Sequence, residues 1–265
     1  MNKETVMPPR IQRHEKIIAL VREHGFMPID TLARELDVTP QTIRRDINLL
    51  CEENILRRYH GGAALGESLE NEDFLSQKNK LQSEKAHLAD LVAAHIPDNA
   101  SLFMSIGTTI EAVAMALVKN HKNLCIITNN IHVAAIVSGR SDYTVIITSG
   151  VVRPVDGGVT GVATVDFINQ FKVDYAVLSA SGIEPDGSLL DFDYKEVSVM
   201  QAMMKNARIR YLAVDHSKLG RNALVRMGDI TEFHALFTDE EPSAALGKKL
   251  ADHGVKWYLA DKEDE

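Results

Sequence analysis

The sequence contains few cysteines and few aromatic residues, which limits the kinds of site it can form. Among its 265 residues are two cysteines and one tryptophan. Neither Cys51 nor Cys125 has a second cysteine or a histidine at the spacing of a zinc site. We therefore predict that both cysteines are buried, reduced thiols, and we expect neither a metal site nor a cofactor.

Long apolar runs are also missing. The sequence has no run of 18 apolar residues, the length that predicts a transmembrane helix. The segment from Met1 to Arg10 is polar, includes two prolines and lacks the apolar centre of a signal peptide. We expect a protein that does not enter a membrane and that resides in the cytoplasm.

Negative charge is in excess, but it is unevenly distributed. The net charge is −8, which by itself argues against a partner as acidic as DNA. Residues 1–64 contain ten Lys and Arg against nine Asp and Glu, whereas the remaining residues contain 19 against 28. The acidic excess therefore lies in the second part of the chain. It does not exclude a local basic cluster in the first part, formed by Arg44, Arg45, Arg57 and Arg58.

The stretch from Thr39 to Leu50 is typical of a DNA-recognition helix. Thr39 suits a helix N-cap, and Pro40 suits the first helical position, where no N–H is needed. Ile43, Ile47 and Leu50 form one apolar stripe. The other side carries side chains that fit base edges and phosphates, namely Gln41, Thr42, Arg44, Arg45 and Asn48.

This helix alone would fit an ordinary amphipathic surface helix equally well, but its neighbours favour DNA binding. Residues 17–21 and 29–36 predict two earlier helices, and Asp37-Val38 predicts a tight turn into the third. That is the order of a helix-turn-helix. Residues 55–63 then form a basic strand and a glycine turn, which predicts a wing that lies along the DNA.

Residues 13–64 resemble the winged helix-turn-helix of DeoR-type bacterial repressors. The matching residues are Arg13-His14, the run from Pro40 to Ile47, and the run from Arg57 to Ala63. The resemblance implies that a double-stranded DNA operator is the partner. The residues expected to contact it are Thr39, Gln41, Thr42, Arg44, Arg45, Asn48, Arg57, Arg58 and His60.

The rest of the chain predicts a second, α/β domain. Residues 65–80 are polar and predict a linker between a first domain at 1–64 and a second at 81–265. Apolar segments typical of strands alternate with helical patterns, which predicts a parallel sheet covered by helices. The expected strands are 101–105, 124–128, 143–148, 174–179, 209–214, 235–238 and 255–259, and the expected helices between them include 109–119, 131–138, 162–171, 194–206 and 243–253.

Small, hydroxyl and amide residues follow these strands, at the edge where open α/β sheets bind ligands. A single such loop more often marks only a turn and an N-cap, but six at one edge favour an anionic ligand held by helix N-termini, with Arg153 and Lys218 adding charge. The candidate ligand-binding residues are Ser105, Gly107, Thr108, Thr109, Thr128, Asn129, Asn130, Gly150, Arg153, Asp156, Gly157, Gly158, Gly161, Ser181, Gly182, Asp193 and Lys218.

The second domain also resembles the sensor domain of DeoR-type repressors, which is similar to ribose-5-phosphate isomerase and CoA-transferase-like folds. The match includes Ile106-Gly107-Thr108-Thr109, Thr128-Asn129-Asn130, Asp156-Gly157-Gly158 and the run from Asp215 to Ala223. The resemblance implies that a phosphorylated metabolite, such as glycerol 3-phosphate or a sugar phosphate, binds here and relieves repression. We also expect a homo-oligomer, dimer or tetramer, because two-fold operators need paired DNA-binding heads.

Two positions depart from the family pattern. Ser105 stands where members often have Asp, and Met200 stands where they often have Lys. An Asp and a Lys facing one pocket would form an ion pair, so losing both keeps the charge balanced. The departure leaves the effector open, and a sulfosugar derivative is an alternative.

Two other functions compete with a ligand-responsive repressor. One is an isomerase-like or CoA-transferase-like enzyme, and the other is an architectural DNA binder whose second domain only oligomerises. An enzyme needs a general base. Ser105 cannot serve as a base unaided, and Asp191 and Asp193 are expected to cap the helix near Tyr194. Asp215 and His216 are adjacent in the chain, and adjacent side chains seldom point at the same place. We therefore predict that the protein is not an enzyme.

Overall fold

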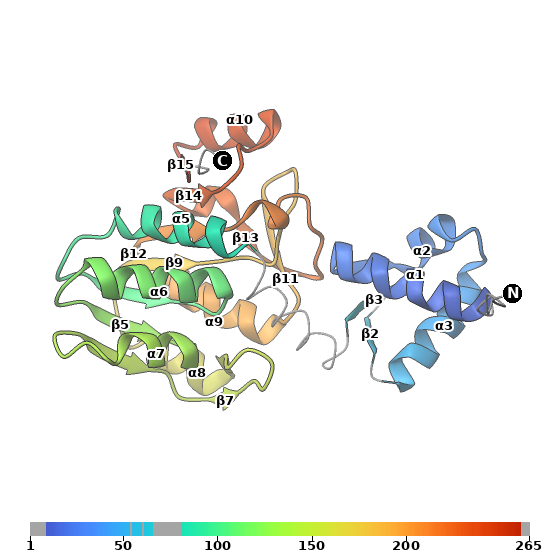
Figure 1. The fold of residues 1–265 in the computed structure, drawn as a ribbon, viewed down its shortest axis with the longest axis horizontal. Coiled ribbons are helices and arrows are strands. Elements are labelled where there is room, and N and C mark those ends of the chain that lie inside the picture. Colours follow the sequence, from blue (N-terminus) through green and yellow to red (C-terminus); the bar gives the residue numbers. More distant parts are fainter. Residues whose placement is uncertain (1–8, 54, 60, 66–80, 261–265) are drawn as a thin grey trace, which may run out of the picture. The chain divides into compact units, whose positions relative to one another are not determined.

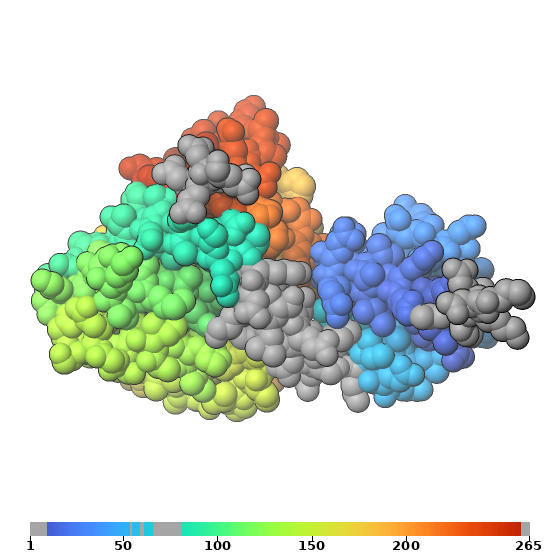
Figure 2. Space-filling view, in the orientation of Figure 1, coloured from blue at the N-terminus to red at the C-terminus, as the bar shows by residue number. Residues whose placement is uncertain are grey.

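The computed structural model describes residues 9–53, 55–59, 61–65 and 81–260. The chain divides into two compact units, Met1–Leu75 and Ser76–Glu265, which are coloured from blue to red along the chain in Figures 1 and 2. Apart from Leu65, the expected linker at 65–80 lies outside the described residues, as does His60.

The first unit contains the expected three helices and wing, together with one strand that the sequence did not predict. Its elements are α1 (Pro9–His24), β1 (Phe26–Pro28), α2 (Ile29–Glu35), α3 (Pro40–Glu52), β2 (Leu56–Tyr59) and β3 (Gly62–Leu65). The strands β2 and β3 form the predicted antiparallel hairpin. The short strand β1 pairs with β3, so the wing belongs to a three-stranded sheet.

The start of α3 agrees with the prediction from sequence. The Thr39 hydroxyl accepts a hydrogen bond from the Thr42 backbone N–H at 3.2 Å, which satisfies one of the free donors at the helix start. The predicted apolar stripe is buried, since Ile43, Ile47 and Leu50 are at most 1% exposed. These three side chains pack with Ile17 and Val21 of α1 in one core.

The second unit is built on a seven-stranded parallel sheet, and all seven expected strands are confirmed. The order across the sheet is β15-β14-β12-β9-β4-β5-β6, with every neighbouring pair parallel (Figure 1). The strands are β4 (Ser101–Met104), β5 (Cys125–Thr128), β6 (Thr144–Ile147), β9 (Val173–Leu178), β12 (Ala207–Ala213), β14 (Ala235–Thr238) and β15 (Lys256–Leu259).

Helices cover both faces of this sheet, because alternate strand residues enter two different apolar cores. Leu102 and Met104 pack in one core with α5 and α6, whereas Phe103 packs in the other with Met200 and Met203 of α9. The helices are α5 (Gln82–Ala93), α6 (Thr108–Asn120), α7 (Ile131–Val137), α8 (Val162–Ile168), α9 (Tyr194–Lys205) and α10 (Ala244–Asp252). Burial on both faces is the usual state of a parallel sheet.

Several short elements were not predicted. The strands β10 (Gly182–Ile183), β11 (Ser188–Asp191) and β13 (Val225–Asp229) form an antiparallel sheet, and β7 (Val151–Val152) pairs with β8 (Val159–Thr160). The 3-10 turns η1 (His216–Lys218) and η2 (Ile230–Glu232) complete the unit. No helix in the described part of the chain is long and apolar enough to cross a membrane.

The cysteines are less buried than predicted. Cys51 and Cys125 are both free thiols, as expected, but each is only partly buried. Cys51 lies on the last turn of α3 and Cys125 begins β5, at the ends of elements where cover is thinner. Burial nevertheless raises the pKa of both thiols above the ordinary value.

Candidate DNA interface and effector site

The outer face of α3 presents the expected recognition side chains to solvent. Gln41, Arg44, Arg45 and Asn48 are exposed. Thr42 is half-buried, since its hydroxyl lies 2.9 Å from that of Thr39. These side chains have forked donors or acceptors of the kind that read base edges, and the arginines also neutralise phosphate.

One hydrogen bond joins this face to the wing. Arg58 of β2 donates from Nη1 to Asn48 Oδ1 of α3 at 2.8 Å. Both residues are exposed, as is Arg57 beside them on the same strand. This bond brings the predicted wing residue Arg58 to the recognition helix, while the predicted contact His60 lies outside the described residues.

A buried carboxylate fixes α3 against α1. Asp46 is 2% exposed and accepts from Arg13 at Oδ2 (Nε, 2.6 Å) and Oδ1 (Nη2, 3.1 Å), with His14 Nε2 3.0 Å from Oδ1. Burial alone would raise the pKa of Asp46, but the bonds from Arg13 and His14 outweigh it and lower that pKa. This contact explains the Arg13-His14 pair, which the resemblance matched without giving it a role.

In the second unit, the predicted ligand residues gather at the carboxyl edge of the sheet. Ser105, Asn129 and Ser181 lie beyond the ends of β4, β5 and β9, which are neighbours in the order β9-β4-β5. The loop after β7 closes onto this edge, because Asn129 Nδ2 donates to the Val159 carbonyl at 3.1 Å and Val159 N donates to the Asn129 carbonyl at 2.6 Å. The loops therefore meet as the parallel strands predict.

Glycine lets this loop approach the sheet closely, and at Gly150 a positive φ of +147° is a further reason for it. A Cβ at Gly158 would lie 2.3 Å from Ile106 Cδ1, and one at Gly150 would lie 2.2 Å from Thr164 Oγ1. Gly107, with φ of +135°, adopts a conformation that disfavours other residues just before Thr108 and Thr109 open α6. These positions shape the edge through backbone packing.

Three buried polar atoms just after β5 and β6 have no hydrogen-bond partner among the described residues. They are Asn129 Oδ1, Asn130 Nδ2 and Thr148 Oγ1, and their residues are at most 5% exposed. The other half of the Asn130 amide is used, because its Oδ1 caps α7 by accepting from His132 N at 2.9 Å. Thr128 is also used, donating from Oγ1 to the Met104 carbonyl at 2.7 Å. Unsatisfied buried donors and acceptors are costly, so they mark places where a ligand hydroxyl would be stabilised.

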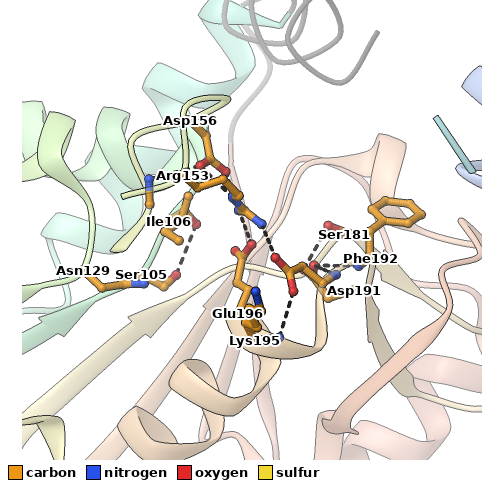
Figure 3. A network of polar contacts seen from close by, with 12 residues as sticks. Ser105, Ile106, Asn129, Arg153, Asp156, Ser181, Asp191, Phe192, Lys195 and Glu196 are labelled. Carbon is orange, nitrogen blue, oxygen red and sulfur yellow. Dashed lines mark hydrogen bonds and ion pairs between the residues drawn. The ribbon is translucent and has the colours of Figure 1, made fainter. Parts of the chain in front are cut away.

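Arg153 is the centre of the polar network drawn in Figure 3. Its guanidinium donates to Asp156 (Nε–Oδ1, 3.0 Å; Nη2–Oδ2, 2.5 Å), to Asp193 (Nη1–Oδ2, 3.1 Å) and to Glu196 Oε2. Burial works against the charged guanidinium, but Glu196 and Asp156 hold the pKa of Arg153 above its ordinary value. From the sequence we expected Arg153 to bind an anionic ligand, whereas in the structure its guanidinium is bound by three carboxylates of the protein.

Two carboxylates of this network have raised pKa values. Burial, followed by repulsion from Asp191, raises the pKa of Glu196 to about 8. Burial also raises the pKa of Asp191, whose Oδ2 accepts from the Ser181 hydroxyl at 2.9 Å. Glu196 was missed by sequence reasoning, although its place three residues after the N-cap Asp193 was a signal for a buried first-turn carboxylate.

The expected caps of α9 are half confirmed. Asp193 is the N-cap and accepts from Lys195 N at 2.8 Å. Asp191 is not a cap, because it ends β11 and its Oδ1 accepts from Phe192 N at 2.7 Å instead. It points to Ser181, at the open end of the β10–β11 pair, rather than to the helix (Figure 3).

A second buried charged cluster lies where β12 ends. Asp215 and Lys218 are buried beside Lys85 of α5 and Glu111 of α6. Burial alone would raise the pKa of Asp215, but Lys218, the Ser217 hydroxyl and Lys85 lower it. Burial lowers the pKa of Lys85, against the opposing effects of Asp215 and Glu111. Lys85 and Glu111 were not predicted, since helical spacing alone gives no sign that they face a loop.

His216 does not pair with Asp215, in agreement with the prediction. Its Nδ1 lies 2.6 Å from Oδ2 of Asp239, which follows β14, and its backbone N donates to the other oxygen at 2.6 Å. The hydrogen bond to Asp239 raises the pKa of His216. The imidazole therefore fastens two neighbouring loops.

The remaining predicted glycines lie in the same loops. Gly157 (φ +67°) packs beside His132, and Gly161 (φ +120°) precedes α8. A Cβ at Gly182 would lie 2.1 Å from the Arg221 carbonyl, where β10 meets the loop after η1. No group of three His, Cys, Asp or Glu side chains in the described ranges is arranged to hold a metal ion.

Comparison with known proteins agrees with this division of the chain. Residues 13–68 match a family described as the DeoR-like helix-turn-helix domain, and residues 80–240 match the DeoR C-terminal sensor domain. Together these matches include α2, α3, the wing and most of the seven-stranded sheet.

Similar full-length proteins are transcriptional regulators. The chain is 46% identical to the glycerol-3-phosphate regulon repressor of Escherichia coli (strain K12), over 94% of this chain and 98% of that protein. It is 40% identical to the HTH-type transcriptional repressor CsqR of the same strain, over 95% and 96% of the two chains.

Among solved structures, ribose 5-phosphate isomerase A from Methanocaldococcus jannaschii matches with a TM-score of 0.38 and 13% identity, over 53% of this chain and 55% of that chain. The helix-turn-helix, the sensor sheet and the full-length relatives lead to one conclusion: the chain belongs to the DeoR family of helix-turn-helix transcriptional regulators.

Proposed function

We propose that this protein is a transcriptional repressor of a glycerol or carbohydrate catabolic operon, released from its operator by a phosphorylated metabolite. In this proposal the first domain (1–64) binds the operator, residues 65–80 link the domains, and residues 81–265 bind the effector and form a dimer or tetramer. Glycerol 3-phosphate is the first candidate effector, because the similar E. coli repressor is named for that regulon. A sugar phosphate is the second.

The exposed face of α3 is the observation that supports operator binding most directly. Gln41, Arg44 and Arg45 are exposed and have no side-chain partner among the described residues. An apolar back and a cationic, amide-bearing front suit a helix that enters a major groove. In this reading α3 reads bases while Arg57 and Arg58 hold the backbone.

The orphaned polar atoms support effector binding at the carboxyl edge of the sheet. Asn129 Oδ1 and Asn130 Nδ2 offer one acceptor and one donor, which suits neighbouring ligand hydroxyls. The start of α6 after Gly107 offers backbone N–H groups to a phosphate, and Lys218 supplies charge at the same edge. A small polyol phosphate has both kinds of group.

The enzyme alternative has less support. The carboxylates of buried Asp156 and Glu196 and of half-buried Asp193 are bound to Arg153, and Asp215 lies beside Lys218. A general base must reach a substrate proton, whereas these groups are used in holding loops together. Turnover of sugar phosphates or acyl-CoA donors by the purified protein would favour the enzyme instead.

A thermal-shift screen of phosphorylated three- to six-carbon metabolites tests the proposal, with glycerol 3-phosphate first. An effector at 100 times its Kd should stabilise the protein by about 2.7 kcal/mol. The same compound should lower operator affinity, while its dephosphorylated form should do neither. If no phosphorylated metabolite alters stability or DNA affinity, the effector proposal is wrong and the architectural alternative gains.

A further inference from the structure

A hollow of about 360 Å³ lies away from the carboxyl edge, at the end of α9. It is lined by Gln201, Met204, Lys205, Arg210, Arg226, Met227, Gly228 and Glu232. Met204 and Met227 lie beneath it and are at most 5% exposed, while Lys205 and Arg226 on its rim are exposed. These residues come from α9, β12, β13 and η2.

The charge of this lining is opposite to that of the surrounding chain. Lys205, Arg210 and Arg226 lie in this lining with one carboxylate, Glu232, and Arg226 also lies 3.8 Å from the carboxylate of Asp229. Residues 65–265 as a whole contain 19 Lys and Arg against 28 Asp and Glu. Glu232 is in addition partly satisfied, because its Oε1 accepts from the Asp229 backbone N–H at 2.8 Å. Such a reversal concentrates attraction for an anion at one place.

The cations are positioned for a ligand. Arg210 is held by two carbonyls, donating from Nε to Glu232 O at 2.6 Å and from Nη1 to Met204 O at 3.4 Å. Lys205 has no side-chain partner among the described residues. Arg226 has a side chain that is 66% exposed and lies 3.8 Å from Asp229 Oδ2, a distance too long for a hydrogen bond.

We infer that this hollow is a second anion-binding site, which takes a free phosphate or the phosphate group of a small phosphomonoester. The arginines supply forked N–H donors that match phosphate oxygens, and Lys205 adds a mobile point charge. Gly228 lets the Glu232 side chain lie close to the backbone, because a Cβ at Gly228 would lie 2.6 Å from Glu232 Oε1.

The site is joined to the Arg153 network by two elements. The helix α9 carries Glu196 in its first turn and Lys205 at its end, and Gln201 Nε2 ties the helix to β13 by donating to Met227 O at 2.9 Å. The strand β13 pairs with β11, with Arg226 opposite Leu190 and Val225 opposite Asp191. An anion that draws Lys205 toward Arg226 therefore acts on the elements that hold Glu196 and Asp191. This coupling between the hollow and the Arg153 network rests on the proposed function, whereas anion binding in the hollow does not.

Calorimetric titration of the full-length protein with inorganic phosphate, and separately with glycerol 3-phosphate, tests the binding at constant ionic strength set with chloride. Arg226→Glu and Lys205→Glu should each weaken saturable phosphate binding at least tenfold, as losing one charge-assisted hydrogen bond predicts. Arg208→Glu is the matched control, because Arg208 is also exposed, on β12, and pairs with Asp174 at 3.4 Å outside the hollow. Its affinity should stay within about twofold of wild type. Equal losses in Arg208→Glu and Arg226→Glu, or no saturable binding by wild type, would overturn the inference.

Methyl NMR of methionine-labelled wild-type protein gives a readout that needs no variant. Phosphate should shift the Met204 and Met227 methyl signals and leave Met115, which is 56% exposed on α6, unchanged. Lys218→Ala separates the two sites, because phosphate should still shift Met204 and Met227 in that variant. If Lys218→Ala abolishes all phosphate binding, the anion site is at the carboxyl edge of the sheet. The inference of a second site in the hollow is then wrong, while the proposed function stands. Binding of glycerol 3-phosphate but not of phosphate at the hollow would also contradict the inference, since the phosphate group is its recognised part.

Discussion

The cations at the two candidate sites of this protein are held in opposite ways. In the first, Arg44 and Arg45 are exposed and have no side-chain partner among the described residues. In the second, Arg153 is bound by three carboxylates and Lys218 is buried beside Asp215. A polyanion can therefore dock on α3 without rearranging it, whereas an anion at the sheet edge must compete with groups already in place.

This difference suits the proposed division of labour. A surface that binds DNA gains from a preformed cationic face, since phosphate contacts supply much of the affinity. A sensor must change state when its ligand binds, and a ligand shifts an equilibrium only through differential contacts. A ligand anion that takes the place of Asp193 or Glu196 at Arg153 would supply such a difference, because both residues lie at the start of α9.

The largest expected effect concerns the anchor of the recognition helix. Asp46→Asn removes the charge that Arg13 and His14 contact, leaving the arginine without its partner. The free energy of unfolding should fall by about 3 kcal/mol, the cost of breaking a buried ion pair on one side. Urea unfolding followed by circular dichroism measures it. Asp30→Asn, at the exposed Asp30 near the start of α2, is the control. An equal loss in both variants would contradict the role of Asp46 as the anchor of α3.

The next effect concerns base reading by α3. Arg45→Ala should weaken operator binding by about 1–3 kcal/mol, roughly 5- to 150-fold in Kd, if the guanidinium contacts a base. Fluorescence anisotropy with specific and scrambled duplexes measures the loss. Arg34→Ala, at an exposed position of α2 where the side chain has only a 3.4 Å bond to Thr31, should bind like wild type. Unchanged affinity in Arg45→Ala would take this residue off the recognition surface.

A smaller effect concerns the pH dependence of the sensor unit. The folded pKa of Glu196 is raised to about 8 from an ordinary 4.5. Between those values the unfolded chain loses a proton that the folded chain keeps, so the unfolding free energy should fall as pH rises toward 8. The slope has a limit of about 1.4 kcal/mol per pH unit for one proton.

Glu196→Gln should flatten this pH dependence, because glutamine does not titrate. Urea midpoints between pH 5 and 9 measure the slope in wild type and variant. Glu241→Gln, at an exposed position before α10, should retain the wild-type slope. A variant that keeps the full slope would show that another group is responsible.

The smallest expected change in DNA binding belongs to the sensor edge. Lys218→Ala should bind the operator as wild type does, within about twofold, since the lysine lies in η1 of the second unit. Release by effector should nevertheless need a higher concentration, because a charged contact is lost. Operator titrations at several concentrations of glycerol 3-phosphate measure both quantities. An equally inducible variant would count against Lys218 as a ligand contact.

Local signals in the sequence predicted more of the structure than long-range ones could. Thr39 and Pro40 placed the start of α3 correctly because capping involves residues three apart. The seven strands followed from short apolar runs. The β10–β11–β13 sheet was missed because Gly182 and Ile183 are too short a segment to show a period, and their pairing is set by the fold.

The sequence predicted the location of the candidate site better than the contacts between its side chains. Loops after parallel strands meet at one edge whatever their side chains, so Ser105, Asn129 and Ser181 could be grouped from order alone. The partners of Arg153 could not be predicted, since Glu196 is 43 positions away and arrives on α9. The same holds for Lys85, which reaches Asp215 from a helix that precedes the sheet.

Operator release by effector tests the central claim most directly. A duplex selected from random DNA by the full-length protein would be titrated at fixed salt, with and without saturating glycerol 3-phosphate, and the other phosphorylated metabolites that stabilise the protein would follow. The account predicts specific binding that weakens at least tenfold, about 1.4 kcal/mol, when the effector is present. Specific binding that no stabilising metabolite changes would contradict it.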